Sequence, residues 1–395
     1  MFWGMALQEN CMRILYHHRT LGDGAEGIHI REMVKAFRSL GHEVRVMGPV
    51  GESTPDCSVK AGIFARIKRL LPTHLFELCE VAYTAYCFIS ISVEIWKFRP
   101  DFIYDRYITF NAGAVLAGLA SRVPVCLEVN APLALERSQE TDEQLVFRKT
   151  AFLIERWVSA HASRTIVVST PLKNYLEAVG VPAGKCLVMP NGVDPDHFYP
   201  RAKDGDLSDR LGIANDDFVV GFTGVLRPWH GLDLLVSAFA KLVKRGSKIF
   251  LLIVGDGPFL DPLERMIRDL GVERRVGITG RIPHDMVPTH VALFDVAVSP
   301  RATFYASPMK VMEYMALGKP VVVPHTANFL DFIDVGVSGL TFEKGNADSL
   351  ENAIESLCKL PAICSELGLR GREKVENRLN WVWNAKEVCR YFKAR

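Results

Sequence analysis

Short apolar runs that end at glycine or proline alternate along the first half of the chain with segments of helical periodicity. The runs are RILYHH at 13–18, HEVRVMGP at 42–49, DFIYDRY at 101–107, PVCLEVN at 124–130 and RTIVVS at 164–169, and helical spacing covers 28–40. Strands that alternate with helices are typical of a parallel sheet, because each helix returns the chain to the same edge. The pattern therefore predicts an α/β domain.

A second series of the same kind begins after residue 217. Its apolar runs are FVVGFTG at 218–224, KIFLLIVG at 248–255, RVGITG at 275–280, VAVSP at 296–300 and PVVVP at 320–324. Between the two series, residues 190–209 are rich in proline, glycine and aspartate and lack periodicity, so they are interpreted as a linker with a hinge near Tyr199. A closing helix at 381–393 has one apolar face that could pack on either domain. We expect two Rossmann-like, doubly wound domains that face each other across a cleft.

Composition agrees with two packed domains and narrows the class of protein. The 395 residues are 49% hydrophobic and 23% charged, which suits two α/β cores and excludes wholesale disorder. A formal net charge of +2 provides no overall field for capturing nucleic acid. The nine cysteines form no CxxC pair, so neither a disulfide framework nor a zinc site is expected. A cytoplasmic location is expected, since residues 1–11 lack the features of a signal peptide.

Two segments of the first half bear on membrane association. The apolar run at 81–93 is well short of the ~20 residues needed to cross a bilayer, so we expect a helix that does not span. The preceding segment AGIFARIKRLL, at 61–71, combines three basic residues with an apolar face. It is interpreted either as peripheral contact with a membrane surface or as an ordinary amphipathic helix of the domain.

A glycine-rich loop follows the first strand. Gly22, Gly24 and Gly27 form a GxGxxG pattern that opens a helix, where backbone amides could hold an anion. A dinucleotide site also needs an acidic residue at the end of the second strand, but that strand ends in Gly48 and Pro49, which makes a dehydrogenase the weakest alternative. The glycines could instead serve only a tight turn and close helix packing.

Two polar residues on the first turns of the same helix are candidates for the acceptor site. Glu26 and His29 would face the cleft and could bond a polar acceptor. A solvated helix face is the alternative.

A second loop with candidate binding residues spans residues 224–231, GVLRPWHG, between a strand and a helix. Gly224 opens the loop, and Arg227 could form a bidentate pair with phosphoryl oxygens, or it could simply stack on Trp229. His230 would bind phosphate well only if the site keeps it protonated.

The next two strands also end in glycine turns, which lie at one sheet edge if the sheet is parallel. Gly255 and Gly257 let backbone amides approach a ligand, and Arg281 and Ile282 follow the third turn. Open α/β sheets bind ligands at this carboxyl edge. Simple connections between strand and helix are the alternative for each turn.

The most distinctive stretch is SPMKVMEYMALGKPVVV at 307–323, which predicts a loop, a helix and a strand. Lys310 and Glu313 are the only charges early in an otherwise apolar helix. A carboxylate at Glu313 could accept both hydroxyls of a ribose while Lys310 meets phosphates. The alternative is a surface ion pair of i,i+3 spacing.

Taken together, these motifs resemble the family-four retaining glycosyltransferases of the GT-B architecture over nearly the whole chain. The resemblance rests on GAEGIHIREMVKAFRSLGHEVRV, RTIVVSTPLKNYLEAVGVPAGKCLVMPNGVD, VGDGP, SPMKVMEYMALGKPVVV and GVSGLTFEKGNADSL. It implies an N-terminal acceptor domain of residues 1–198 with a returning helix at 378–395, and a nucleotide-sugar donor domain of residues 199–377. It also implies a hexosyltransferase that needs no metal or other cofactor and serves a glycan or lipid-linked acceptor in cell-surface polysaccharide or glycolipid synthesis.

The resemblance also assigns donor roles to particular residues. Glu313 would hold the donor ribose, the backbone of Ser307, Pro308 and Met309 would cradle the diphosphate, and Arg281 with Ile282 would border the base. Departures from the commonest family pattern are Tyr305 in place of a glutamate, Val225 and His230 in place of the basic pair of the phosphate loop, and Asn130 in place of a histidine.

These departures leave the catalytic assignment open. We expect Arg227, His230 and Lys310 to stabilise the departing phosphate, with Asn130 as a further catalytic candidate. The alternatives are a GT-B-type sugar-nucleotide epimerase and a catalytically impaired protein that only binds nucleotide-sugar.

Overall fold

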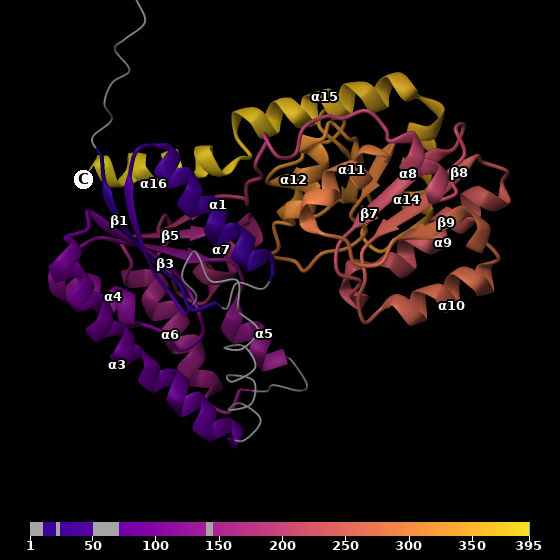
Figure 1. The fold of residues 1–395 in the computed structure, drawn as a ribbon. Helices are drawn as coiled ribbons and strands as arrows, with labels where there is room; N and C mark the ends of the chain where they lie inside the picture. Colours follow the sequence, from indigo (N-terminus) through magenta and orange to yellow (C-terminus); the bar gives the residue numbers. More distant parts are fainter. Residues whose placement is uncertain (1–10, 21–23, 50–70, 140–144, 395) are drawn as a thin grey trace, which may run out of the picture. The chain divides into compact units, whose positions relative to one another are not determined.

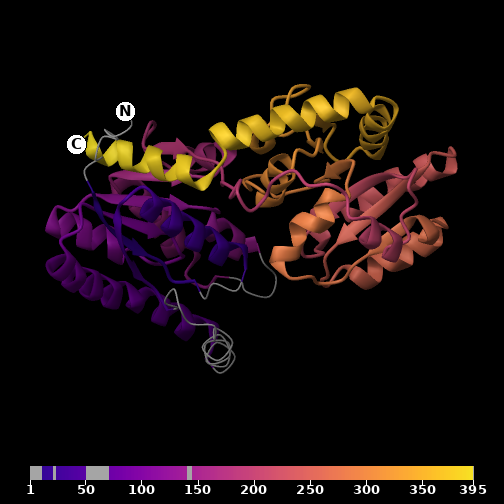
Figure 2. The same cartoon turned by 45° about the horizontal axis from the view of Figure 1, so that its top comes forward.

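A computed structural model describes residues 11–20, 24–49, 71–139 and 145–394 and divides the chain into two compact units. The first unit comprises Met1–Met189 with Trp381–Arg395, and the second comprises Pro190–Asn380. Each unit holds one six-stranded sheet whose described pairings are all parallel. The predicted fold class, two Rossmann-like α/β domains, is confirmed, and each sheet has helices on both faces (Figures 1 and 2).

The first sheet has the strand order β2-β1-β3-β4-β5-β6. Its strands are β1 (Arg13–His17), β2 (Glu43–Met47), β3 (Phe102–Arg106), β4 (Val125–Val129), β5 (Arg164–Val167) and β6 (Cys186–Val188). The five predicted apolar runs form β1 to β5, and the three-residue edge strand β6, which lies in the run CLVMP at 186–190, was not predicted. The strand order reverses between β1 and β3, which is where open sheets of this type bind ligands.

Two helical layers cover the first sheet. The helices are α1 (Ala25–Ser39), α3 (Thr73–Phe98), α4 (Gly113–Ser121), α5 (Leu133–Gln139), α6 (Arg148–His161), α7 (Thr170–Ala178) and α16 (Trp381–Lys393). α1 and α16 lie on one face, and α3, α4 and α6 lie on the other (Figure 1). The closing helix α16 therefore packs in the first unit, where the Phe392 ring stacks on Phe102 at 4.5 Å between centroids.

Helix α3 contains the apolar run at 81–93 and extends beyond it at both ends. The helix extends over 26 residues, about twice the length of that run, and by length and composition it could cross a membrane. Glu77 and Glu80, which precede that run, belong to the helix and are buried. Most of the apolar stretch of α3 is not buried inside the described structure. Residues 61–70 of the basic segment lie outside the described residues.

The second sheet has the strand order β12-β11-β10-β7-β8-β9. Its strands are β7 (Phe218–Thr223), β8 (Ile249–Val254), β9 (Val276–Ile278), β10 (Val296–Val298), β11 (Val321–Pro324) and β12 (Leu340–Phe342). The predicted runs form β7 to β11, and the sequence analysis missed the short edge strand β12. Here the order reverses between β10 and β7.

Two hydrophobic cores enclose this sheet, one on each face. The helices are α8 (Gly205–Arg210), η1 (Pro228–His230), α9 (Leu232–Lys244), α10 (Leu260–Leu270), η2 (Glu273–Arg275), η3 (His284–Met286), α11 (Val287–Ala292), α12 (Met309–Ala316), α13 (Ala327–Leu330), α14 (Ala347–Lys359) and α15 (Pro361–Asn377). α9, α10 and α14 pack together, and α12 packs with α15. Strands buried on both faces explain the continuous apolar runs of the sequence.

The segment after residue 189 packs into the second unit although its sequence lacks periodicity. The Val193 N–H donates to the Leu379 carbonyl at 3.2 Å, and the Arg372 guanidinium donates to the Phe198 carbonyl at 2.6 Å. These contacts attach the segment to α15 and the residues after it.

Candidate functional site

Glycine loops at the carboxyl edge of the second sheet pack against one another, backbone to backbone. A Cβ atom on Gly255 would lie 2.0 Å from the Gly224 carbonyl oxygen, and Gly255 has a φ of 148°, so only glycine fits. A Cβ on Gly257 would lie 2.5 Å from the Leu226 oxygen. Gly255 also forms a bridge with Gly280. The turns after β7, β8 and β9 therefore form one continuous surface.

Lys310 reaches this surface from the first turn of α12, which follows β10. Its Nζ lies 4.1 Å from the centre of the Phe222 ring and would be 2.9 Å from a Cβ on Gly224. Burial lowers the pKa of Lys310 to about 7, and the Glu313 carboxylate only partly offsets this effect. The ammonium therefore lies at the strand-order reversal between β10 and β7 with little compensation for its charge.

Glu313 lies one turn along α12 from Lys310, but the surface ion pair considered for these two described residues does not form. Instead, a Glu313 carboxylate oxygen lies 3.9 Å from Nε2 of His284. Arg281 is exposed and Ile282 is partly buried, both in the loop after β9, and Tyr305 is partly buried before α12. The α12 helix begins after Pro308 with its amide groups directed toward the carboxyl edge, a geometry that favours anions.

The loop after β7 places Arg227 and His230, both expected to bind phosphate, in different environments. Arg227 is exposed, and its guanidinium lies 5.4 Å from the centre of the Trp229 ring, which is the stacked alternative. His230 Nδ1 bonds to the Val225 carbonyl at 2.7 Å, so this nitrogen carries the proton. Burial, together with the charge of Lys310, lowers the pKa of His230 to about 4. His230 is therefore neutral at pH 7 and presents Nε2 as a hydrogen-bond acceptor, not as the cation expected for phosphate.

Several residues that the sequence analysis missed hold the loop before α12 in place. Ser307 accepts from the Asn191 backbone N–H at 3.0 Å through Oγ, and from the Asn191 side-chain amide at 2.8 Å through its carbonyl. The Asn328 amide donates to the Ala306 carbonyl at 2.8 Å. Arg301, just beyond β10, donates weakly to the Pro228 carbonyl at 3.4 Å. Asn191 belongs to the PNGVD motif, which was the available signal for its importance.

The first unit has a polar cluster at the carboxyl edge of its own sheet. Gly22 lies outside the described residues, whereas Gly24 precedes α1 and Gly27 is buried in its first turn. Glu26 is partly buried, and a Cβ on Gly24 would lie 2.6 Å from its carboxylate. His29 is buried rather than solvated, with its ring 4.6 Å from the Trp381 ring of α16.

Glu128 at the end of β4 is the centre of this cluster. One of its carboxylate oxygens lies 3.0 Å from Nε2 of His29 and accepts from Arg106 at 2.7 Å. The same oxygen accepts from the Asn130 side-chain amide. Burial acts to raise the pKa of Glu128, but His29, Arg106 and the hydrogen bonds together hold it well below its usual range. Asn130 is thereby fixed at the sheet edge by a carboxylate that sequence reasoning did not identify.

A second buried pair lies beside it, between β1 and β3. His17 Nδ1 and an Asp105 carboxylate oxygen are 2.6 Å apart, and Nε2 of His17 lies 3.5 Å from the Cys87 sulfur. Burial acts to lower the pKa of His17, but the bond to Asp105 outweighs it and raises the pKa to about 10. Nothing in the sequence around His17, at the end of β1, indicated that it would pair with Asp105.

Each unit therefore has a charged site at its own strand-order reversal. In the second unit, an ammonium, a helix N-terminus and a carboxylate converge, and these groups suit a diphosphate joined to a ribose. Among the described residues, no group of three or more histidine, cysteine, aspartate or glutamate side chains is placed to hold a metal ion.

Two family models match consecutive parts of the chain. The model described as "Glycosyltransferase Family 4" matches residues 26–197, and "Glycosyl transferases group 1" matches residues 204–374. The boundary between the matches falls close to the boundary between the two compact units. The resemblance inferred from the motifs is confirmed.

The chain is also similar in sequence to individual glycosyltransferases. A GDP-mannose-dependent alpha-(1-6)-phosphatidylinositol monomannoside mannosyltransferase from Mycolicibacterium smegmatis is 31% identical over 208 residues, 50% of this chain and 53% of the relative. The chain thus matches little more than half the length of that relative. A UDP-Gal:alpha-D-GlcNAc-diphosphoundecaprenol alpha-1,3-galactosyltransferase from Escherichia coli is 25% identical, with 73% of this chain and 75% of the relative covered.

Solved structures support the fold. The crystal structure of HepE from Anabaena in complex with UDP has a TM-score of 0.73 and 20% identity, covering 97% of this chain and all of that chain.

Proposed function

We propose, since this chain belongs to the family-four glycosyltransferases of the GT-B architecture, that it is a retaining hexosyltransferase. It moves a sugar from a nucleotide-sugar to a glycan or lipid-linked acceptor and uses no metal or other cofactor. The nucleotide-sugar is a substrate.

The observation that carries the proposal is the placement of Lys310 and Glu313 on successive turns of α12, at the strand-order reversal of the second sheet. Lys310 lies against Gly224, so a diphosphate on that loop would meet the ammonium directly. Glu313 is one turn away, where a carboxylate can accept from both hydroxyls of a ribose. Ser307, held by Asn191, supplies backbone for the diphosphate.

Transfer requires the leaving nucleoside diphosphate to be stabilised as its negative charge grows. Lys310 and the first-turn amides of α12 supply that stabilisation, and Arg227 contributes only if it leaves Trp229. His230 has a different role, because its neutral Nε2 accepts a hydrogen bond from a sugar hydroxyl. The missing basic pair of the phosphate loop is thus replaced by one cation on α12.

Retention follows if the acceptor attacks the sugar face that the diphosphate leaves, with a departing phosphate oxygen taking the acceptor's proton. Proton NMR of the first product formed from an α-linked donor tests this step. An α-linkage supports retention, and a β-linkage refutes it.

Two relatives favour a lipid-linked acceptor: a phosphatidylinositol monomannoside mannosyltransferase and an alpha-monoglucosyldiacylglycerol synthase. On this proposal the protein acts in glycolipid or cell-surface polysaccharide synthesis, in the cytoplasm and peripherally on the inner face of the membrane.

A thermal-shift panel of UDP-, GDP- and ADP-sugars tests donor binding. A ligand at about 100 times its dissociation constant stabilises the folded chain by ~2.7 kcal/mol. Lys310→Met and Glu313→Gln should remove half of the shift or more, and Lys344→Met, an exposed lysine of the same unit, should preserve it. A full shift in both site variants would refute the donor site.

Product analysis separates the alternatives. A transferase releases nucleoside diphosphate in proportion to the acceptor consumed, whereas an epimerase leaves the sugar nucleotide-linked. A protein that only binds nucleotide-sugar does neither.

A further inference from the structure

Helix α3 presents an apolar face to solvent along nearly its whole length. Between Leu75 and Trp96, a span of roughly 30 Å, no exposed position carries a charged side chain. The exposed positions in this span are Leu75, Leu78, Cys79, Ala82, Ala85, Tyr86, Ile89, Val93 and Trp96. Trp96 is 77% exposed and Ile89 is 61% exposed, so these side chains lie at the surface and do not contribute to the core.

Two of the three carboxylates of α3 are buried instead. Glu77 is fully buried and accepts from the backbone N–H groups of Val146 and Phe147 at 2.8 and 2.7 Å. Glu80 pairs with Arg137 at 2.9 Å. The helix therefore reverses the usual arrangement of a surface helix, in which charges face water. Burying a carboxylate costs solvation free energy, which a surface helix with its charges in water would avoid.

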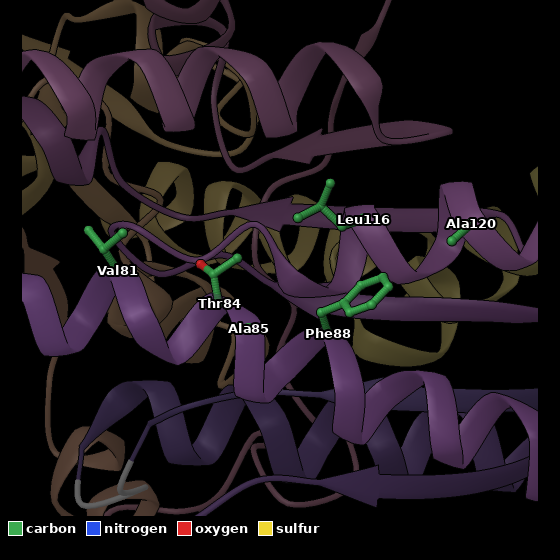
Figure 3. A pocket seen from close by; sticks show the side chains of 6 residues that line it. All are labelled: Val81, Thr84, Ala85, Phe88, Leu116 and Ala120. Carbon is green, nitrogen blue, oxygen red and sulfur yellow. The ribbon is translucent and has the colours of Figure 1, made fainter.

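A groove beside α4 widens the apolar face. It has a volume of about 470 Å³ and is lined almost entirely by apolar atoms. Figure 3 shows the side chains that line it, which come from both helices: Val81, Thr84, Ala85, Phe88, Leu116 and Ala120. Leu119 of α4 is also exposed, by 52%. Contiguous exposed apolar surface of this kind marks a site of interaction with a protein or a membrane.

Basic residues border one end of this face. Lys97 and Arg99 follow Trp96 at the carboxyl end of α3, and Arg122 follows the carboxyl end of α4; all three are exposed. α3 and α4 run in the same direction, since Thr84 bonds to Ala112 at the start of α4 and Phe88 lines the groove with Leu116. The three cations therefore lie at a common end of the face, next to an exposed tryptophan.

We propose that the α3–α4 face, defined by the exposed residues and groove above, binds the surface of an anionic lipid bilayer. The aliphatic and aromatic side chains enter the boundary between headgroups and acyl chains, and Lys97, Arg99 and Arg122 bind lipid phosphates. Trp96 takes the interfacial position typical of that residue. The inference rests on the proposed function, for which a lipid-linked acceptor has to be reached at a membrane.

The helix lies on the bilayer and does not cross it. Its inner face is part of the folded unit, with Cys87 and Ile91 fully buried and Glu77 bonded to backbone. Crossing would strip these partners away and place two carboxylates in hydrocarbon, which is costly.

Flotation with lipid vesicles tests the proposal on the full chain. The probes are phosphatidylcholine vesicles with and without one-third phosphatidylglycerol. The parent should float with the anionic vesicles, and Ile89→Glu or Trp96→Glu should weaken binding tenfold or more. A double charge reversal, Lys97→Glu with Arg122→Glu, should weaken binding to anionic vesicles only.

The matched control is Leu369→Glu, which changes an equally exposed leucine on α15 of the second unit and should bind vesicles as the parent does. All substituted side chains are exposed, and thermal melting checks that the variants fold. The proposal is overturned if the parent does not bind, if Ile89→Glu binds normally, or if light scattering shows an oligomer that these variants dissociate. The last result would identify a second copy as the partner.

Donor binding distinguishes this proposal from the proposed function. Ile89→Glu should keep the parent's thermal shift with nucleotide-sugar. Vesicle binding without any nucleotide-sugar shift would reject the proposed function alone, and the reverse result would reject the membrane face alone.

Discussion

Lys310 provides a sharp test of the donor site because its ammonium is buried with little compensation. With a pKa of about 7, it is half neutral in the free protein at pH 7 and about nine-tenths neutral at pH 8. A bound diphosphate favours the ammonium and raises that pKa. Binding should therefore take up about 0.5 proton at pH 7 and about 0.9 proton at pH 8.

The same linkage determines how affinity changes with pH. Because the protonated form binds, the dissociation constant should rise about fivefold from pH 7 to pH 8, then about tenfold per unit until the pKa of the complex is reached. Lys310→Met should remove both the proton uptake and this pH dependence. It should also weaken binding by ~10- to 100-fold, the range for one hydrogen bond to a charged group.

Isothermal titration calorimetry in two buffers of different ionisation enthalpy measures the uptake. The ligand is the nucleotide-sugar that gives the largest thermal shift, since its diphosphate diester does not titrate in this range. The other titratable groups near Lys310 are Glu313 and His230, and Arg227 adds a fixed charge. His230→Gln should retain the uptake at pH 8, and so should Lys344→Met. If the parent took up no proton at pH 8, or Lys310→Met took up as much, Lys310 would not be the group that meets the diphosphate.

Further predictions concern the packing of both sheet edges. Glu128→Gln should lower the free energy of unfolding by ~3 kcal/mol or more in urea titration, because it leaves Arg106 buried without its counter-charge; Glu264→Gln, in an exposed pair, should cost less than ~1 kcal/mol. The raised pKa of His17 means that its pairing stabilises the fold fully below pH 6.5, its ordinary pKa, and is lost as pH rises through about 10. The melting temperature should fall over that interval in the parent and remain flatter in His17→Gln. Gly255→Ala should abolish the nucleotide-sugar thermal shift, because its Cβ would overlap a carbonyl oxygen 2.0 Å away; an unchanged shift would show that the loop contact is dispensable.

Local patterns anticipated the strands best where burial covers both faces. The runs that became β7, β8 and β11 are continuous and bounded by glycine or proline, so they were recognisable without any partner. The edge strands β6 and β12 have only three residues each, and their existence depends on pairing with β5 and β11. Length alone does not explain why these two strands were missed, since β9 and β10 also have three residues each and were predicted.

The candidate site was likewise predictable only in part. The sequence alone indicated a glycine loop at Gly224, a helix carrying Lys310 and Glu313, and their meeting at a carboxyl sheet edge, because chain order and parallel topology place loops predictably. It did not indicate that His230 is neutral, since that depends on its bond to the Val225 carbonyl and on the nearby charge of Lys310.

Which charges are buried and which apolar residues are exposed depends on packing between elements that are distant in the sequence. Glu128 gains its role from His29 and Arg106, residues brought together from three different elements. The solvent-facing side of α3 is invisible in a sequence, because a helix that is apolar almost all round has no preferred face until its neighbours cover one of them. The order of the elements and the family could be predicted from local sequence patterns, whereas the protonation and exposure of the side chains depend on contacts between distant residues.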